Sequence, residues 1–209
     1  MVTTKLGFSL LFLNLVLYIV VTVESIVSKR SNPIDFIKFS CKSTLYPVLC
    51  VHCLIGYANS IRQSEQQLAI AALNVSLSWT STCASFVKKN TNIRGIKPRE
   101  HRAMLDCIAN IDSSADNLRQ SARELHLTGN NAIGEKFDWH MSNVQTWVSA
   151  ALTYQSTCLD GFAGPQMDGK LKDAIRGRVI SVSQVTSNAL ALVNSFASRH
   201  QTTTLNKKP

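Results

Sequence analysis

Acidic residues are scarce in this chain: 13 Asp and Glu stand against 22 Lys and Arg among its 209 residues, which gives a formal net charge of +9 at pH 7. The sequence also lacks any stretch in which apolar and polar residues alternate between turn signals, and this absence excludes a β-sheet protein. A chain of this length still supports one domain with a proper core. We therefore expect an all-α fold.

The signatures of common enzyme classes are missing as well. There is no G-x-S-x-G elbow, no H-E-x-x-H, no glycine-rich phosphate loop and no dinucleotide fingerprint. Asp106, Asp112 and Asp116 recur on adjacent helix turns, but narrow helices offer no cleft to hold a sugar between two carboxylates, so we interpret them as a solvated face. The scattered histidines are interpreted as surface residues: His52, His101, His126, His140 and His200. We expect no enzymatic activity and no cofactor.

The N-terminus indicates export. Lys5 precedes an apolar run from Leu6 to Val23, and Ser25 stands at a plausible cleavage position. This predicts a signal peptide over residues 1–25 and a mature domain over 26–209, with an uncleaved anchor as the alternative. We expect no later segment to span a membrane. Asn74-Val75-Ser76 is a glycosylation sequon, which suits a secreted protein if that face is exposed.

Apolar residues recur at helical spacing in four long segments. The second is the clearest, with a stripe that alternates steps of four and three: Met104, Ile108, Ile111, Ala115, Leu118, Ala122 and Leu125. Pro98 suits a first helical turn and Thr128-Gly129-Asn130 supplies a stop, so we predict this helix over 97–127. Similar stripes run from Leu68 through Trp79 to Phe86, from Phe137 to Cys158 and from Leu171 to Phe196. Together they predict an antiparallel four-helix bundle over residues 66–200.

Residues 32–59 are too short and too broken by turns to add a fifth long helix, and we predict a helical hairpin that folds at Leu45-Tyr46-Pro47. A Cys41–Cys50 bridge would close a loop of about ten residues and stabilise the hairpin by about 2.7 kcal/mol. Cys107 and Cys158 lie on the second and third long helices, where a bridge would contribute about 4 kcal/mol and lock the two together. In an exported protein, disulfides are the first interpretation of these cysteines.

Two cysteines remain, Cys53 and Cys83, and the sequence leaves open whether they pair or stay free. Cys50 and Cys53 have the C-x-x-C spacing of thiol oxidoreductases, but no βαβ pattern surrounds them. A zinc site at Cys50, His52 and Cys53 lacks a second Cys/His pair, so we expect no metal. Cys83 stands one position off the Trp79–Phe86 stripe and is interpreted as a buried thiol.

Four stretches carry a family resemblance: the C-x8-C hairpin with Tyr46-Pro47, MLDC at 104–107, NVQTWVSAALTYQSTCLDGF at 143–162 and VTSNALALVN at 185–194. Together they resemble the plant invertase and pectin methylesterase inhibitor family. The resemblance implies a secreted, disulfide-stapled four-helix bundle in the apoplast or cell wall, with the bridges Cys41–Cys50 and Cys107–Cys158. It implies a monomeric inhibitor that covers the cleft of pectin methylesterase in a one-to-one complex through its middle helices. An invertase target, or another partner, is the alternative.

The resemblance also nominates contact residues. Thr157, Asp160 and Asp116 keep the family pattern, and Thr146 lies within the most specific matching stretch. These four are the candidate partner contacts, although Thr157 could equally be a surface hydroxyl and Asp160 a helix cap. The chain departs from the pattern two, four and six places after Cys107, where the family has an acidic residue, a tyrosine and an aspartate. Here those positions hold Ala109, Ile111 and Ser113.

Basic residues gather in two groups, around the first inter-helix loop and at the start of the fourth helix: Lys88, Lys89, Arg94, Lys97, Arg99 and Arg102, then Lys170, Lys172, Arg176 and Arg178. Each group is interpreted as a solvated face. The alternative is weak attraction to acidic pectin, which would weaken with salt. Nucleic acid is not expected as a partner outside the cell.

Overall fold

The computed structural model describes residues 32–93, 95–128, 134–163 and 169–205, and within them all regular structure is helical. The predicted signal peptide and Arg94 lie outside the described residues. Four long helices form the bundle: α5 (Glu65–Asn90), α6 (Pro98–Leu127), α7 (Glu135–Gly161) and α8 (Lys170–Leu205). The hairpin consists of α2 (Pro33–Cys41) and α3 (Pro47–Leu54), followed by a 3-10 turn (Ile55–Tyr57) and the short α4 (Ala58–Ile61). The predicted fold class and the predicted hairpin turn are confirmed.

Local chemistry explains where these helices begin and end. The Ser64 hydroxyl accepts a hydrogen bond from the backbone N–H of Gln67 at 3.2 Å, so Ser64 caps the start of α5. Pro98 occupies the first turn of α6, where the Lys97 N–H donates to the Glu100 carboxylate at 3.1 Å. The helix predicted over 97–127 therefore begins one residue later than expected.

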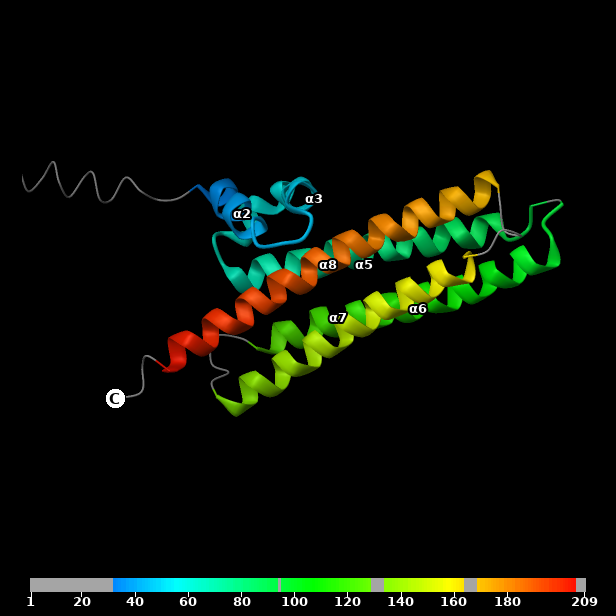
Figure 1. Ribbon diagram of the computed structural model, residues 1–209. Coiled ribbons are helices and arrows are strands. Elements are labelled where there is room, and N and C mark those ends of the chain that lie inside the picture. Colours follow the sequence, from blue (N-terminus) through cyan, green and yellow to red (C-terminus); the bar gives the residue numbers. More distant parts are fainter. Residues whose placement is uncertain (1–31, 94, 129–133, 164–168, 206–209) are drawn as a thin grey trace, which may run out of the picture. The chain divides into compact units, whose positions relative to one another are not determined.

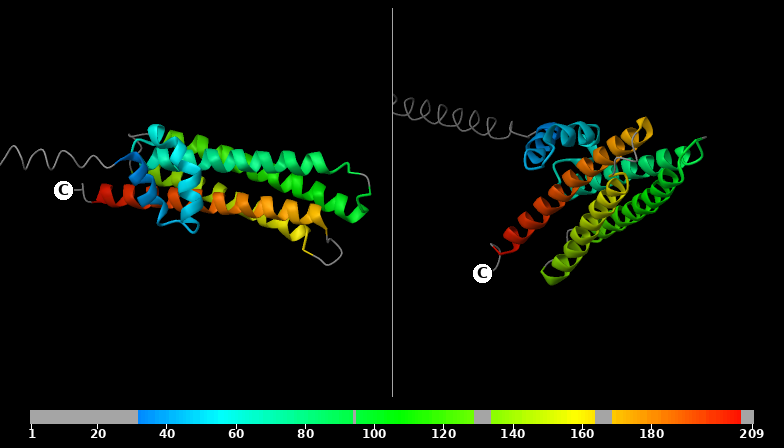
Figure 2. Two further views of the ribbon diagram at one scale, coloured as in Figure 1. Left: turned by 90° about the horizontal axis from the view of Figure 1, so that it is seen from above. Right: turned by 45° about the vertical axis from the view of Figure 1, so that its right-hand side comes forward.

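Each long helix packs against two neighbours: α5 and α7 each contact both α6 and α8, and the α6–α7 pair is the most extensive. Figure 1 shows α5 and α8 in one layer and α6 and α7 in the other. The hairpin lies across the α5–α8 layer, as the left view of Figure 2 shows, and α3 contacts both of these helices. The α6–α7 layer is left uncovered by the hairpin.

A buried polar layer divides the core into two apolar clusters. The Gln155 amide on α7 donates to Ser114 Oγ on α6 at 2.9 Å and to Thr186 Oγ1 on α8 at 3.0 Å. Ser76 Oγ on α5 lies 2.7 Å from the same Thr186 oxygen. Because Thr186 gives its own proton to the Val182 carbonyl, Ser76 is the donor. All four long helices thus meet at one level, and a shift of any helix along its axis would break these bonds.

The apolar stripe predicted for the first long helix is wrong in part. Trp79 is 36% exposed and Phe86 is half-buried, while Thr80, Cys83 and Val87 face the core. By length and composition alone α5 is long and apolar enough to cross a membrane, although the sequence predicted no such later segment. Yet 56% of that window is buried inside the protein, and α5 packs between α6 and α8. We therefore assign α5 as a core helix.

Asn188 attaches the hairpin to the bundle. Its side chain on α8 accepts from the Tyr46 N–H at 3.0 Å and donates to the Tyr46 carbonyl at 2.9 Å. Asn188 is almost fully buried, at 4% exposure, and it is the partner of the Tyr46 N–H, while the Tyr46 carbonyl also accepts from the Cys50 N–H at 2.9 Å. The disulfide between Cys41 and Cys50, confirmed in the structure, closes the other side of the same turn.

The Asn188→Ala variant should loosen the hairpin without unfolding the bundle. The variant leaves the part-buried Tyr46 N–H without its partner, while the Tyr46 carbonyl keeps the bond from the Cys50 N–H at 2.9 Å. The loss should cost about 1–3 kcal/mol, and hydrogen exchange should accelerate in residues 33–61 but not in α6 or α7. Asn194→Ala is the matched control, because its bond to Gln145 at 2.9 Å is exposed. Equal exchange in the two variants would contradict the assigned role of Asn188.

Candidate protein-binding face

The candidate contacts on α7 lie on one exposed face. Thr157 and Asp160 follow Thr146 by eleven and fourteen positions, which at the α-helical rotation brings them to within about 20° and about 40° of its direction. All three side chains are exposed, and exposed Ser149 and Thr153 continue the row between them. We call these five residues the α7 row.

Most hydroxyls in the α7 row bond back to their own helix. Ser149, Thr153 and Thr157 donate to the carbonyls four residues earlier, at 2.8, 3.2 and 3.0 Å. Their protons are therefore used, and each oxygen faces solvent as an acceptor. Among the residues that the structure describes, the Asp160 carboxylate has no partner, and its backbone carbonyl is the atom that accepts from Ala163 at 2.9 Å. The row is a surface of short side chains that offers acceptors and one negative charge.

The register of α6 against α7 is fixed by two contacts. The disulfide joins Cys107 to Cys158, as predicted. Fourteen residues further along α6, Ser121 Oγ lies 3.4 Å from the carbonyl oxygen of Val144, which is fourteen residues back along α7. The Ser121 hydroxyl also donates to the Asn117 carbonyl of its own helix, at the shorter distance of 2.9 Å. The two helices are antiparallel, so each step forward along α6 from Cys107 corresponds to one step back along α7 from Cys158. Ala109 is therefore level with Ser156, and Asp116 is level with Ser149.

The positions nominated on α6 do not all reach the surface. Asp116 is exposed and forms an ion pair with Arg119, and Ala109 is exposed as well. Ser113 is half-buried, whereas Ile111 has no exposed surface and packs in the same apolar cluster as the Cys107–Cys158 bridge. Only two of the three departures from the family pattern can therefore meet a partner, because Ile111 is a core residue.

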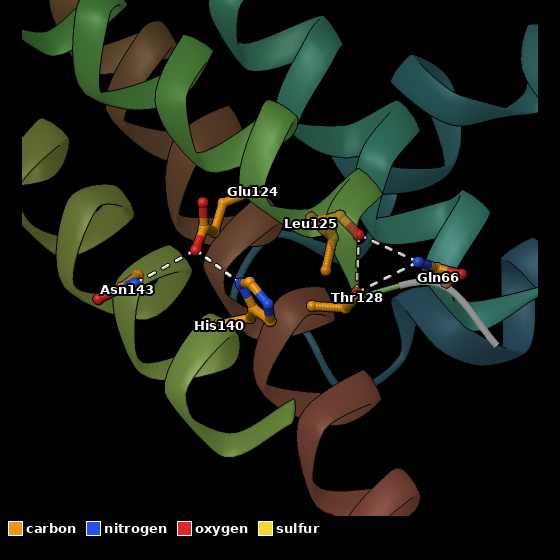
Figure 3. A network of polar contacts seen from close by, with 6 residues as sticks. All are labelled: Gln66, Glu124, Leu125, Thr128, His140 and Asn143. Atoms are coloured by element: carbon orange, nitrogen blue, oxygen red, sulfur yellow. Dashed lines mark hydrogen bonds and ion pairs between the residues drawn. The ribbon is translucent and has the colours of Figure 1, made fainter. Parts of the chain in front are cut away.

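The prediction that every histidine is a surface residue is wrong for His140. The residue is buried, with 8% of its surface exposed. Its Nδ1 lies 2.8 Å from Oε1 of Glu124, and the same oxygen accepts a hydrogen bond from the Asn143 amide at 3.2 Å. Figure 3 shows this group beside Gln66, whose amide reaches from α5 to donate to Thr128 Oγ1 at 3.2 Å. Position 140 follows Phe137 by three and precedes Val144 by four, so its helical spacing already placed it beside the core. The network closes the α6–α7 pair at the end far from the disulfide.

The remaining cysteines, Cys53 and Cys83, are free thiols. Burial raises the pKa of Cys83 to about 11, against a smaller opposite effect of the Arg178 charge, and burial also raises the pKa of Cys53. Because the thiolate is the reactive form, a raised pKa is the reverse of what a redox site needs. Cys50, the other half of the C-x-x-C spacing, is already bonded to Cys41.

The sequon residue Asn74 is exposed on α5, outside the α6–α7 layer. Ser76, which completes the sequon, is fully buried and bonded to Thr186. A glycan at Asn74 would thus have to be attached before α5 packs, and would not cover the α7 row.

The family model for plant invertase/pectin methylesterase inhibitors matches residues 35–192, which include both disulfides and most of the hairpin. The chain belongs to this family. Its members named Pectinesterase inhibitor 9 and Pectinesterase inhibitor 11, both from Arabidopsis thaliana, are 48% and 44% identical to it. The first alignment covers 90% of this chain and 94% of the relative, and the second covers 92% and 98%. These are inhibitors by name rather than enzymes.

A solved structure supports the fold. A mutant form of a pectin methylesterase inhibitor from Arabidopsis superposes with a TM-score of 0.57 over 74% of this chain and 92% of that one, at 20% identity. At this level of identity the similarity concerns the fold alone. It agrees with the helical bundle predicted from the apolar spacing.

Thiol labelling at pH 8 tests the assignment of the two free cysteines. A pKa of about 11 leaves roughly a hundredfold less thiolate on Cys83 than the ordinary value of 9.0 would, and burial restricts access further. In the native protein, Ellman's reagent should react slowly and with Cys53 alone. After denaturation it should react with both thiols. Cys83→Ser should leave the native trace unchanged, whereas rapid native labelling of two thiols would contradict the assignment.

Proposed function

We propose that this protein is a secreted inhibitor of pectin methylesterase that covers the pectin-binding cleft of the enzyme with its α6–α7 layer. The observation that carries the proposal is the 48% identity to Pectinesterase inhibitor 9 over nearly the whole of both chains. An invertase target is not favoured, because both relatives described above are named for pectinesterase.

The geometry of the α6–α7 layer supports this role. The α7 row presents short side chains on a regular helix, so a partner can approach the helix closely. The layer is held by the Cys107–Cys158 bridge near one end and by Glu124 and His140 near the other. Since the face is already ordered, little conformational entropy would be lost on binding.

The setting of the inhibitor follows from the same proposal. Residues 1–25 would direct export, and the two disulfides suit the oxidising cell wall. There the protein would act as a monomer in a one-to-one complex. Thr146, Thr157, Asp160 and Asp116 would contact the enzyme.

Titration of enzyme activity tests the proposal. Pectin methylesterase, assayed at mildly acidic pH, should lose activity as the refolded, disulfide-checked protein is added, with saturation near one equivalent. A cell-wall invertase titrated in parallel should keep its activity. Loss of invertase activity alone would reverse the target, and a panel of methylesterases that all stay active would refute the proposal.

Thr157→Arg should weaken inhibition by roughly thirtyfold or more, because it adds bulk and charge at a proposed contact. The unfolding midpoint should not change, since the Thr157 side chain is exposed. Ser85→Arg on α5 is the matched control, with the same exposed position and a back-bond of 2.9 Å to Ser81. Full inhibition by the Thr157 variant would remove this residue from the interface.

Introducing the family's type of residue at Ala109 and at Ile111 should have different effects on inhibition and on stability. Ala109→Glu places an acidic group on the exposed surface level with Ser156, and we expect several-fold tighter inhibition with unchanged stability. Ile111→Tyr forces extra volume and a hydroxyl into a fully buried site, so it should cost about 1–3 kcal/mol of unfolding free energy. A stable Ile111→Tyr variant that inhibits better would show that this position reaches the partner after all.

A further inference from the structure

A groove lies between α5 and α8. These two helices form the layer opposite the proposed inhibitory face (Figure 1). The volume of the groove is about 640 Å³, within the range of small-ligand sites. Small residues of α8 line it, among them Ala174, Gly177 and Ser181, and a side chain added at Gly177 would meet no atom within 4 Å, so a larger residue has room there. Nothing in the proposed inhibitory role uses this groove.

Arg178 supplies a positive charge in the groove. Its guanidinium carbon lies over the Phe86 ring, 4.0 Å from the ring centroid. Stacking on an aromatic face holds the guanidinium and leaves its N–H edge available, and that edge matches the two oxygens of a carboxylate. Among the described residues, Arg178 has no ion-pair partner. The site therefore favours an anion with the planar geometry of a carboxylate.

The other walls of the groove suit a sugar ring. Trp79 contributes a partly exposed indole, which offers an apolar face. The hydroxyls of Thr82 and Ser181 donate back to their own helices, at 2.9 Å each, and so keep their oxygens as acceptors for hydroxyl groups of a ligand. Asp173 adds a further acceptor, whose negative charge disfavours a second carboxylate beside it. One carboxylate, one apolar ring face and several hydroxyls describe a uronic acid.

Charge at this end of the bundle supports an acidic ligand. The end of α5, the start of α6 and the start of α8 all lie at one end of the bundle, as Figure 2 shows in its left view. The groove is near this end, because it is lined by the second half of α5 and the first turns of α8. These three segments carry the described basic residues of both sequence groups: Lys88, Lys89, Lys97, Arg99, Arg102, Lys170, Lys172, Arg176 and Arg178. Such an excess of positive charge attracts polyanions, and the shape of the groove would select among them.

We propose that the α5–α8 groove binds a short galacturonate oligosaccharide, with a carboxylate on Arg178 and a ring face against Trp79. The choice of galacturonate rests on the proposed function, because pectin is the substrate of the proposed target enzyme. The inhibitor would then hold pectin fragments on one layer while its other layer covers the enzyme.

Calorimetric titration of the unglycosylated protein with a linear galacturonate trimer at low salt tests the proposal. The trimer should bind, and a neutral hexose trimer should not. Arg178→Gln should weaken binding by about tenfold or more, through the lost charged hydrogen bonds. Gly177→Leu should fill the groove and abolish binding while the protein stays at least as stable, since leucine favours a helix more than glycine does.

Lys170→Ala is the matched control, because it removes a charge at the same end of α8 without lining the groove. It should change affinity by no more than about twofold. An equal loss in Lys170→Ala and Arg178→Gln, unchanged binding by Gly177→Leu, or no binding of the trimer would each overturn the groove site. All three variants should inhibit pectin methylesterase normally, so failure of the groove site and failure of the inhibitory function give separate results.

Discussion

The disulfide between Cys107 and Cys158 is the constraint on which the candidate face depends. It pairs the two helices that carry every nominated contact, and two contacts at later turns keep its register to within one residue: Ser121 with Val144, and Glu124 with His140. The bond from Gln155 to Ser114 joins the same two helices. Cys107, Ser114 and Ser121 are spaced by seven residues, two helical turns each, so these contacts fall on one side of α6. The exposed side of the same layer is thereby held in a fixed arrangement.

The composition of the core explains why such ties are needed. Many core positions hold alanine, such as Ala72, Ala115 and Ala151, and the layer between the two apolar clusters is polar. Small residues let helices approach closely but bury less apolar surface than leucine would. The disulfides and the buried hydrogen bonds compensate for this smaller apolar burial, and the hydrogen bonds also specify the helix register.

The sequence predicted the parts of the structure that local chemistry controls. The start of α6 followed from Pro98, the hairpin turn from Tyr46-Pro47, and both disulfides from cysteines placed on adjacent elements. The buried side of α5 was predicted poorly, because alanine and leucine occur all around that helix and no single stripe stands out. The roles of Gln155 and Asn188 were missed since their partners lie far along the chain. His140 was interpreted as a surface residue although its spacing from Phe137 and Val144 already indicated the core side of α7. The groove beside Gly177 lies between residues of two helices that are far apart in the sequence, which no periodicity reveals.

Hydrogen exchange of this protein, free and in complex with an active pectin methylesterase, would test the central claim most directly. If the α6–α7 layer covers the enzyme, amide protection should rise in residues 105–116 and 146–160 and stay unchanged in α5 and in the hairpin. Protection confined to α5 and α8, with none on α6 or α7, would contradict the proposed mode of inhibition even if inhibition itself were observed.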